Sequence, residues 1–406
     1  MNKFFQNLFQ VLYPFYPLWA WVAVSFLHFP IEKILIFVLL PVLGYVIWAI
    51  RVRVPAYLIF FIAFTLYHLG ATFYFGLLPT NTTTFFFILS DPNVLACTLF
   101  LIIENTNFEE PFLKRMNRHI LWIVALSLVV SIIQIKIPLF FYNKGMDEEL
   151  NYVGESRNAS IYSWIGLNSC GVSFPILISI LLNFYGTASR FFPLVAISGI
   201  IVSFLTKARF VMISTIIAFL QLLMVRSIPL KKKLYVVGFF VVGIFAIIGA
   251  SKMAGYDINA TINERILEKG DDMRSAKARV VSYDVFMMKF PENPYFGVGP
   301  KTREDVVDLL GGTAPIIHVG YLSYLYYYGA FGASLLFLAL LCLLWDAWII
   351  GRRNDFWGSF YGLLGFTLAN FTFVYFNFSE MGIILAVIYM RYYKVNPIRF
   401  DDHEMA

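Results

Sequence analysis

The chain consists of long, continuous apolar runs joined by short polar connections. Apolar runs of this length predict membrane-spanning helices, because a helix satisfies its own backbone polar groups inside the hydrocarbon. A β-barrel would instead show short segments of alternating polarity. The pattern predicts twelve spans, at residues 11–29, 34–50, 55–75, 83–104, 119–141, 162–184, 191–206, 210–225, 234–251, 318–349, 356–375 and 379–393.

One polar stretch is much longer than the other connections. It covers residues 252–317 and leads into an aromatic run that begins at His318. We therefore expect nine spans in 1–251, a long, partly helical outer loop at 252–317, and three further spans with a polar C-terminus in 318–406. The predicted fold class is an all-α integral membrane protein, a polytopic bundle of about twelve transmembrane helices.

Two of these spans are expected to be irregular. At about 1.5 Å per residue, a helix over 318–349 would be roughly 48 Å long, so it should project beyond the bilayer, tilt or break. Asp91-Pro92 interrupts the span at 83–104, because proline removes a helical hydrogen bond, and predicts a kink or a re-entrant break there. A structural or a functional role for this break stays open.

Composition agrees with a lipid environment. The chain is 59% hydrophobic and 14% charged, whereas a soluble globular chain is about 45–50% apolar and about 25% charged. The net charge of +6 would suggest nucleic acid in a soluble protein, but these residues lie mainly in short loops, so no nucleic-acid partner is predicted. Cys97, Cys170 and Cys342 fall within apolar runs and are expected to be small buried side chains rather than disulfides or metal ligands.

The distribution of positive charge predicts the topology. Lysine and arginine are concentrated in the connections that share a side with the N-terminus, including Arg51, Lys114, Arg226 and Arg352. Because positive residues accumulate in cytoplasmic loops, both termini are expected in the cytoplasm and residues 252–317 outside. The N-terminus has no small-residue cleavage site, which indicates an uncleaved first span.

The first candidate site residue is Arg209, in the connection Lys207-Ala208-Arg209 between two short apolar runs. Each run would be about 24 Å long as a helix, so the tip is expected slightly below the outer surface. An arginine held there is costly without an anionic partner. The alternative is an arginine that extends to the lipid headgroups.

The second candidate lies in the long outer segment. Asp271 or Asp272 is suited to cap a helix that Pro291 ends, and Arg279 and Tyr283 would share one face of it. Such a helix could also be only a surface lid. Asp271-Asp272 superficially suggests a metal-bound nucleotide sugar, but an outer location argues against one and helix capping explains the pair equally well.

The third candidate is His318, where the outer segment re-enters the membrane, followed by Tyr321 and Tyr324. The histidine could be structural, and the tyrosines suit either an interfacial aromatic belt or stacking faces for a sugar. Within other spans, His68 and Glu380 are interpreted as polar residues satisfied by packing.

Together, these pieces resemble the O-antigen ligase-like superfamily of bacterial glycan ligases and polymerases. LTKARF (205–210), KARVVSYDVFMMKFPENPYFGVG (277–299) and HVGYLSYLYYYGAFG (318–332) resemble its arginine tip, its arginine-rich helix with a Pro-x-x-Gly-x-Gly turn, and its histidine followed by aromatics and Gly-x-x-Gly. Many members have Asn directly after that histidine, whereas this chain has Val319.

The resemblance implies a multi-pass glycosyltransferase of the bacterial cytoplasmic (inner) membrane that uses an undecaprenyl-diphosphate-linked glycan donor and a glycan acceptor. It implies diphosphate binding by Arg209, Arg279 and Arg274 without a metal or other cofactor, and a general base at His318. Tyr283, Tyr321 and Tyr324 are candidates for glycan stacking. Membrane lipid and a chain-length regulator would be further partners.

Three functions remain open. A polymerase moves a growing chain onto another lipid-linked repeat unit, and a ligase moves the finished chain onto a lipid A-core acceptor. We favour the polymerase on the high usage of Phe and Tyr and on Val319. A lipid-linked glycan flippase or transporter is the alternative of another class, although such proteins usually carry their charged sites near the midplane, with internal repeats.

Overall fold

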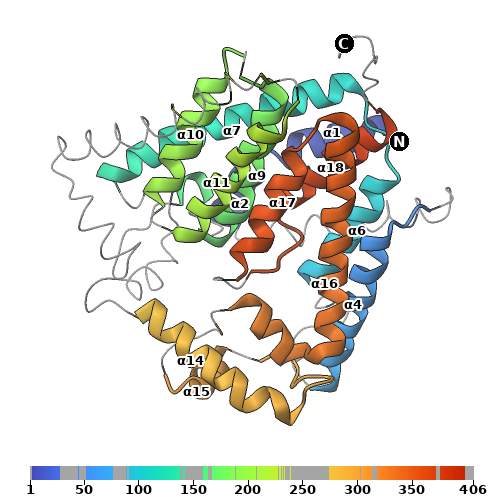
Figure 1. The fold of residues 1–406 in the computed structure, drawn as a ribbon, viewed down its shortest axis with the longest axis vertical. Helices are drawn as coiled ribbons and strands as arrows, with labels where there is room; N and C mark the ends of the chain where they lie inside the picture. Colours follow the sequence, from blue (N-terminus) through green and yellow to red (C-terminus); the bar gives the residue numbers. More distant parts are fainter. Residues whose placement is uncertain are drawn as a thin grey trace.

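The computed structural model describes residues 2–27, 44, 52–75, 88, 91–137, 140–141, 159–162, 167–187, 189–206, 208–226, 228–229, 231, 233, 238, 274–301, 303–312, 317, 319–371 and 375–397. Over these residues the chain forms helices and turns and no strand (Figure 1). The α-helices are α1 (Asn2–Leu12), α2 (Tyr16–Leu27), α4 (Ala56–Tyr74), α6 (Pro92–Glu104), α7 (Glu110–Lys136), α9 (Leu167–Tyr185), α10 (Phe192–Leu205), α11 (Arg209–Met224), α14 (Arg274–Lys289), α15 (Arg303–Leu309), α16 (Gly320–Asn354), α17 (Gly358–Ala369) and α18 (Met381–Val395).

Four of the described helices, α4, α7, α9 and α16, are long and apolar enough to cross a membrane. Helices α6, α10, α11 and α17 are apolar but shorter. An all-α membrane protein is therefore supported, while the count of twelve spans stays a prediction. The predicted span at 34–50, apart from Gly44, and the one at 234–251 lie outside the described residues. The predicted first span at 11–29 begins as a helix only at Tyr16, after the separate helix α1.

Helix α9 is the most buried of the four long helices. Its neighbours approach it through glycine: a Cβ on Gly358 would lie 3.0 Å from the Ile180 Cα, and one on Gly362 would lie 3.1 Å from the Ile176 Cα. The Ser179 hydroxyl also donates to the carbonyl of Gly358 at 2.7 Å. Small residues and interhelical hydroxyl bonds replace the hydrophobic effect as the means of joining helices in lipid.

The bundle has two distinct ends. Figure 1 shows α14 and α15 at one end and α1 at the other, and we call these the α14 end and the α1 end. At the α1 end, Gln6 of α1 donates to the carbonyl of Asn107 at 2.8 Å, and Arg391 near the end of α18 donates to Asn107 Oδ1 at 3.2 Å. The first and last described helices are therefore fastened to each other away from α14.

Helix α6 begins at the Asp91-Pro92 interruption. Asp91 is its N-cap, and its Oδ1 accepts from the backbone N–H of Asn93 at 2.8 Å and of Val94 at 3.3 Å. Pro92 occupies the first helical position, where its missing N–H costs nothing. The predicted break is confirmed, and its local cause is a capped helix start.

Helix α16 breaks at Gly329, whose φ of 63° and ψ of −175° lie outside the helical region. The break exposes backbone groups, and the turn at 293–299 satisfies them. The N–H of Gly299 donates to the carbonyl of Tyr327 at 2.8 Å, and the N–H of Ala330 donates to the carbonyl of Pro294 at 2.8 Å. Of the three outcomes expected for this long helix, the structure shows a break, and the outer segment is joined to α16 there.

Candidate functional site

Arg209 is the first residue of α11, and its side chain is half-buried. The adjacent Phe210 packs directly on Gly171 of α9, where any side chain would collide with the Phe210 ring. Two residues further along α9, Ser173 donates to Glu380 immediately before α18. These contacts fix the backbone at Arg209 at the level where α18 begins.

The start of α16 lies at the same level. Asn370 follows α17, and its carbonyl accepts from the N–H of Gly320, the first residue of α16, at 3.1 Å. The Asn370 side chain accepts from the N–H of Tyr375 at 3.0 Å, and Tyr375 in turn hydrogen-bonds to Glu380. The starts of α11, α16 and α18 therefore lie near one another, toward the α14 end.

Helix α14 carries the second predicted arginine. Val285 and Phe286 of α14 are buried against Ile317 and Tyr326, in a small hydrophobic cluster separate from the main core. Arg279 is half-buried, and burial lowers the pKa of its guanidinium from the usual value. A guanidinium stays charged at neutral pH in proteins, so Arg279 brings a partly desolvated positive charge to the α14 end.

The structure describes the side chains of only some of the other predicted site residues. Arg274 begins α14, but its side chain lies outside the described part of the structure, and so does His318. Tyr283 of α14 is 52% exposed. The ring of Tyr321 lies 4.5 Å from that of Phe371, and the ring of Tyr324 lies 4.9 Å from that of Phe376. Of the three candidate stacking side chains, Tyr283 has the exposed ring and the other two pack among aromatic side chains.

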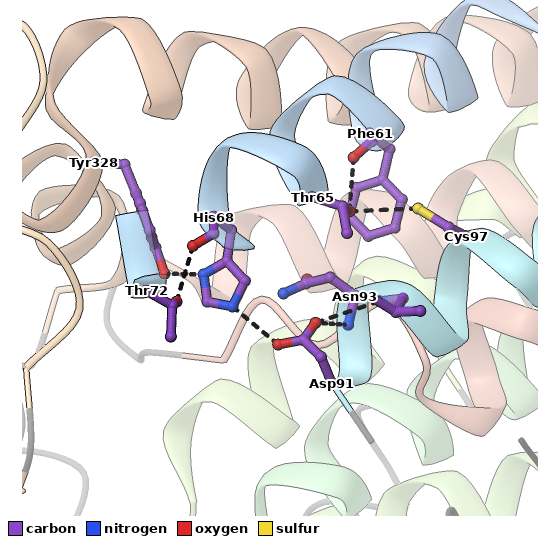
Figure 2. A network of polar contacts seen from close by, with 9 residues as sticks. Phe61, Thr65, His68, Thr72, Asp91, Asn93, Cys97 and Tyr328 are labelled. Atoms are coloured by element: carbon purple, nitrogen blue, oxygen red, sulfur yellow. Dashed lines mark hydrogen bonds and ion pairs between the residues drawn. The ribbon is translucent and has the colours of Figure 1, made fainter. Parts of the chain in front are cut away.

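A polar network that the sequence did not predict joins α4, α6 and α16 (Figure 2). The Nε2 of His68 lies 2.9 Å from Oδ2 of Asp91, and its Nδ1 lies 2.7 Å from the hydroxyl of Tyr328. If His68 donates from Nε2 to the carboxylate, Nδ1 accepts from Tyr328, so all three groups are satisfied with a neutral imidazole. Tyr328 directly precedes the break at Gly329, so this network holds α4 to the break.

A second polar network surrounds the buried carboxylate of Glu380. Its Oε1 accepts from Ser169 at 2.8 Å and from Asn377 at 3.2 Å, and Tyr375 contacts the same oxygen. Because these donors are neutral, the network suits a carboxylate that fastens α9 to the start of α18. His68 and Glu380 are thus both engaged in buried hydrogen bonds, as expected for polar packing. The sequence could not indicate their partners, which lie up to 260 residues away.

No cluster of three or more His, Cys, Asp or Glu side chains suited to a metal ion occurs among the described residues. Arg209 at the start of α11 and Arg279 on α14 both have half-buried guanidinium groups. Positive groups of this kind can bind a phosphate or diphosphate bidentately. The arrangement is therefore suited to an anionic ligand that approaches the α14 end.

Comparison with known families agrees with this arrangement. A family model described as O-antigen ligase matches residues 193–337, from α10 into α16. The match confirms the resemblance to the O-antigen ligase-like superfamily. It spans all of the predicted site residues, Arg209, Arg274, Arg279, Tyr283, His318, Tyr321 and Tyr324. No curated protein sequence matches the chain significantly.

Proposed function

We propose, from the premise that residues 193–337 are an O-antigen ligase-type segment, that this chain is a polysaccharide polymerase of O-antigen type. It transfers a glycan from undecaprenyl diphosphate onto another lipid-linked repeat unit, on the outer face of the bacterial cytoplasmic membrane. The observation that supports this most is that one family match contains every residue expected to hold the diphosphate or to move the proton.

The proposed chemistry depends on charge. The leaving group is a lipid diphosphate, and its negative charge grows as the glycosidic bond breaks. Arg209 and Arg279, with Arg274 as a further candidate, bind this charge through bidentate hydrogen bonds and stabilise the transition state more than the ground state. His318 accepts the proton from the acceptor hydroxyl, since imidazole titrates near neutral pH.

The fold supports lateral access to such a site. Arg209 begins α11 beside the apolar bundle, and Arg279 lies on α14, which packs on the first part of α16 through Phe286. The lipid tail of the donor stays in the bilayer while its diphosphate reaches the α14 end. The glycan then lies on the side of the outer segment.

Substitution of Arg279 tests the proposal. Arg279→Ala removes the guanidinium, and we expect a loss of about 10²–10³ in transfer rate, the usual cost of losing one preorganised donor to developing charge. Arg279→Lys keeps the charge but loses the bidentate geometry, so it should restore only part of the activity. The measurement is the length of surface glycan on cells with verified amounts of each variant in the membrane.

A matched control is Lys289→Ala at the exposed C-terminal end of the same helix, where Lys289 pairs with Glu292 at 2.9 Å. It should leave glycan length unchanged. Full-length glycan in cells that carry Arg279→Ala would remove this residue from the mechanism and the diphosphate proposal with it.

The ligase reaction is the second candidate, because the matching family model is described as O-antigen ligase. Deletion of the gene separates the two. Loss of a polymerase leaves single repeat units attached to their normal acceptor, whereas loss of a ligase leaves finished polymer on the lipid carrier. Stranded polymer in the deletion strain would therefore replace the polymerase with the ligase.

A further inference from the structure

A cleft of about 670 Å³ lies between the last two turns of α4 and the turn that follows α14. Gly70 and Tyr74 line it on the α4 side, and Phe296 and Lys301 line it on the other. Arg209 and Arg279, the two diphosphate candidates whose side chains the structure describes, are not among the residues that line it. The cleft is thus distinct from the arginines at the α14 end that are proposed to bind the diphosphate, and its ligand must be inferred from its own lining.

The floor of the cleft is open because it is made of small residues. Gly70 and Ala71 line it, and a Cβ added to Gly70 would meet no atom within 4 Å. Glycine inside a helix costs about 1 kcal/mol relative to alanine. No close packing between helices explains this glycine, in contrast to Gly358 and Gly362 beside α9.

The walls of the cleft are fixed by two contacts between α4 and the turn. The Tyr67 hydroxyl donates to the carbonyl of Phe296 at 2.8 Å. Beyond it, the ring of Phe75 packs directly on Gly299, where any side chain would collide with it. A cleft held in this way needs little ordering when a ligand binds, and a low ordering cost favours affinity.

The side chains at the cleft combine aromatic faces with polar groups. Tyr74 is 84% exposed and Phe296 is 68% exposed, so both rings are accessible. Asn293 and Lys301, also exposed, contribute an amide and an ammonium group. Exposed rings can cover the C–H faces of a pyranose, while amide and ammonium groups bind hydroxyls or carboxylates. A lipid tail would offer neither of these polar groups a hydrogen-bonding partner.

We propose that this cleft binds an oligosaccharide, through pyranose rings packed on Tyr74 and Phe296 over the Gly70 floor. Resting on the proposed function, it is the subsite that holds the acceptor glycan while the arginines hold the donor diphosphate. The cleft belongs to α4 and the 293–301 turn, so acceptor recognition depends in part on a helix outside the segment matched by the family model.

Binding is tested by protection of a thiol in the purified full-length protein. Gly70→Cys puts the thiol in the open space of the cleft, and Asp308→Cys puts one on an exposed position of α15, which does not line the cleft. Both variants carry Cys342→Ala, because Cys97 and Cys170 are buried and Cys342 is not. The probes are oligosaccharides released by mild acid from the source bacterium's own surface polysaccharide, and dodecyl phosphate as a lipid phosphate.

At ten times its dissociation constant, the oligosaccharide should slow the reaction of a water-soluble maleimide at position 70 about tenfold and leave the reaction at position 308 unchanged. Tyr74→Ala, combined with Gly70→Cys, should shift half-protection to about tenfold higher oligosaccharide concentration. Protection by dodecyl phosphate alone, or by neither probe, would overturn the proposal. These outcomes do not depend on glycosyl transfer, so they leave the proposed function to its own test.

A second measurement is made in cells. Gly70→Leu puts a large side chain at a position where an added Cβ would meet no atom within 4 Å, whereas Gly70→Ala adds only that Cβ. We expect shorter or fewer surface glycans with Gly70→Leu and normal glycans with Gly70→Ala, at equal amounts of protein. Normal glycans with Gly70→Leu would contradict the acceptor subsite, while a loss with Arg279→Ala in the same strain would still support the transferase.

Discussion

Gly297 and Gly329 lie backbone against backbone, so that a side chain on either would collide with the segment that carries the other. A Cβ on Gly297 would lie 2.5 Å from the backbone N of Gly329, and one on Gly329 would lie 2.5 Å from the backbone N of Gly297. Both have positive φ, 73° and 63°. Two of the sequence motifs, the Pro-x-x-Gly-x-Gly turn and the Gly-x-x-Gly step, are therefore the two halves of one contact.

Gly297→Ala should separate the turn at Gly297 from the break in α16 at Gly329. The substitution combines a positive φ with a backbone collision, and we expect a loss of about 1–3 kcal/mol in stability together with a loss of glycan synthesis. The control is Gly311→Ala, which has a φ of 57° but no atom within 4 Å of the added Cβ. It carries the conformational strain alone and should retain glycan synthesis.

Thermal unfolding in detergent and glycan length in cells report the two effects. If Gly297→Ala behaves like Gly311→Ala in both measurements, the contact with Gly329 does not hold the outer segment in place.

The hydrogen bond between His68 and Tyr328 should contribute to the stability of the protein. His68→Ala leaves the carboxylate of Asp91 and the hydroxyl of Tyr328 buried without this partner, at a cost of about 1–3 kcal/mol. Tyr328→Phe removes only the hydroxyl and should cost less. Because both substitutions break the same contact, the double variant should be less destabilised than the sum of the two.

Thermal unfolding of the four proteins of this cycle measures the coupling. His119→Ala is the control, since His119 bonds instead to the carbonyl of Gln10 at the α1 end. Strict additivity of His68→Ala and Tyr328→Phe would show that the contact contributes nothing to stability.

Arg209 should be needed for activity and Arg190 should not. Arg209→Ala removes one of the proposed diphosphate ligands, and we expect a loss of about 10²–10³ in transfer rate. Arg190 lies at the other end of α10, exposed and 4.9 Å from the centre of the Phe191 ring. Transfer of glycan from the lipid-linked donor by purified variants is the measurement, and equal rates for both variants would exclude a role for Arg209.

His318 is predicted to act as the general base, and His318→Ala should abolish transfer at neutral pH. A base that must be neutral to accept a proton gives a rate that falls as pH drops through its pKa, which is about 6.5 for an unperturbed histidine. The transfer rate of the wild-type protein is therefore measured between pH 5 and pH 8. A rate independent of pH over this range, together with an active His318→Ala variant, would contradict the assignment.

The sequence predicted most of the helices but few of the contacts between them. Continuous apolar runs suffice to predict α4, α9 and α11, since lipid demands a helix wherever the chain is apolar. Asp91-Pro92 likewise marks a helix start that can be recognised locally. Tyr328, which bonds to His68, and Ser169, which bonds to Glu380, lie 260 and 211 residues away in the sequence, and no local pattern encodes these contacts.

Helix α14 shows the same limit of prediction from the sequence. The sequence of its helix predicts an apolar side at Val280, Phe286, Met287 and Phe290. Phe286 is buried as predicted, but Val280 and Met287 are more than half exposed, and Val285, which this side did not include, is buried. Which face is covered depends on where the 293–299 turn attaches to α16. That attachment involves backbone groups, so side-chain hydrophobicity could not reveal it.

The attachment of the 293–299 turn to the break in α16 also bears on how this segment can evolve. Backbone hydrogen bonds of the 293–299 turn, together with the packing of Phe286 against Tyr326, hold α14 to the bundle independently of the covalent path through α15. Insertions or deletions between Gly312 and Ile317 would therefore alter the loop without displacing Arg279. That stretch can therefore change in length while the guanidinium stays where it is.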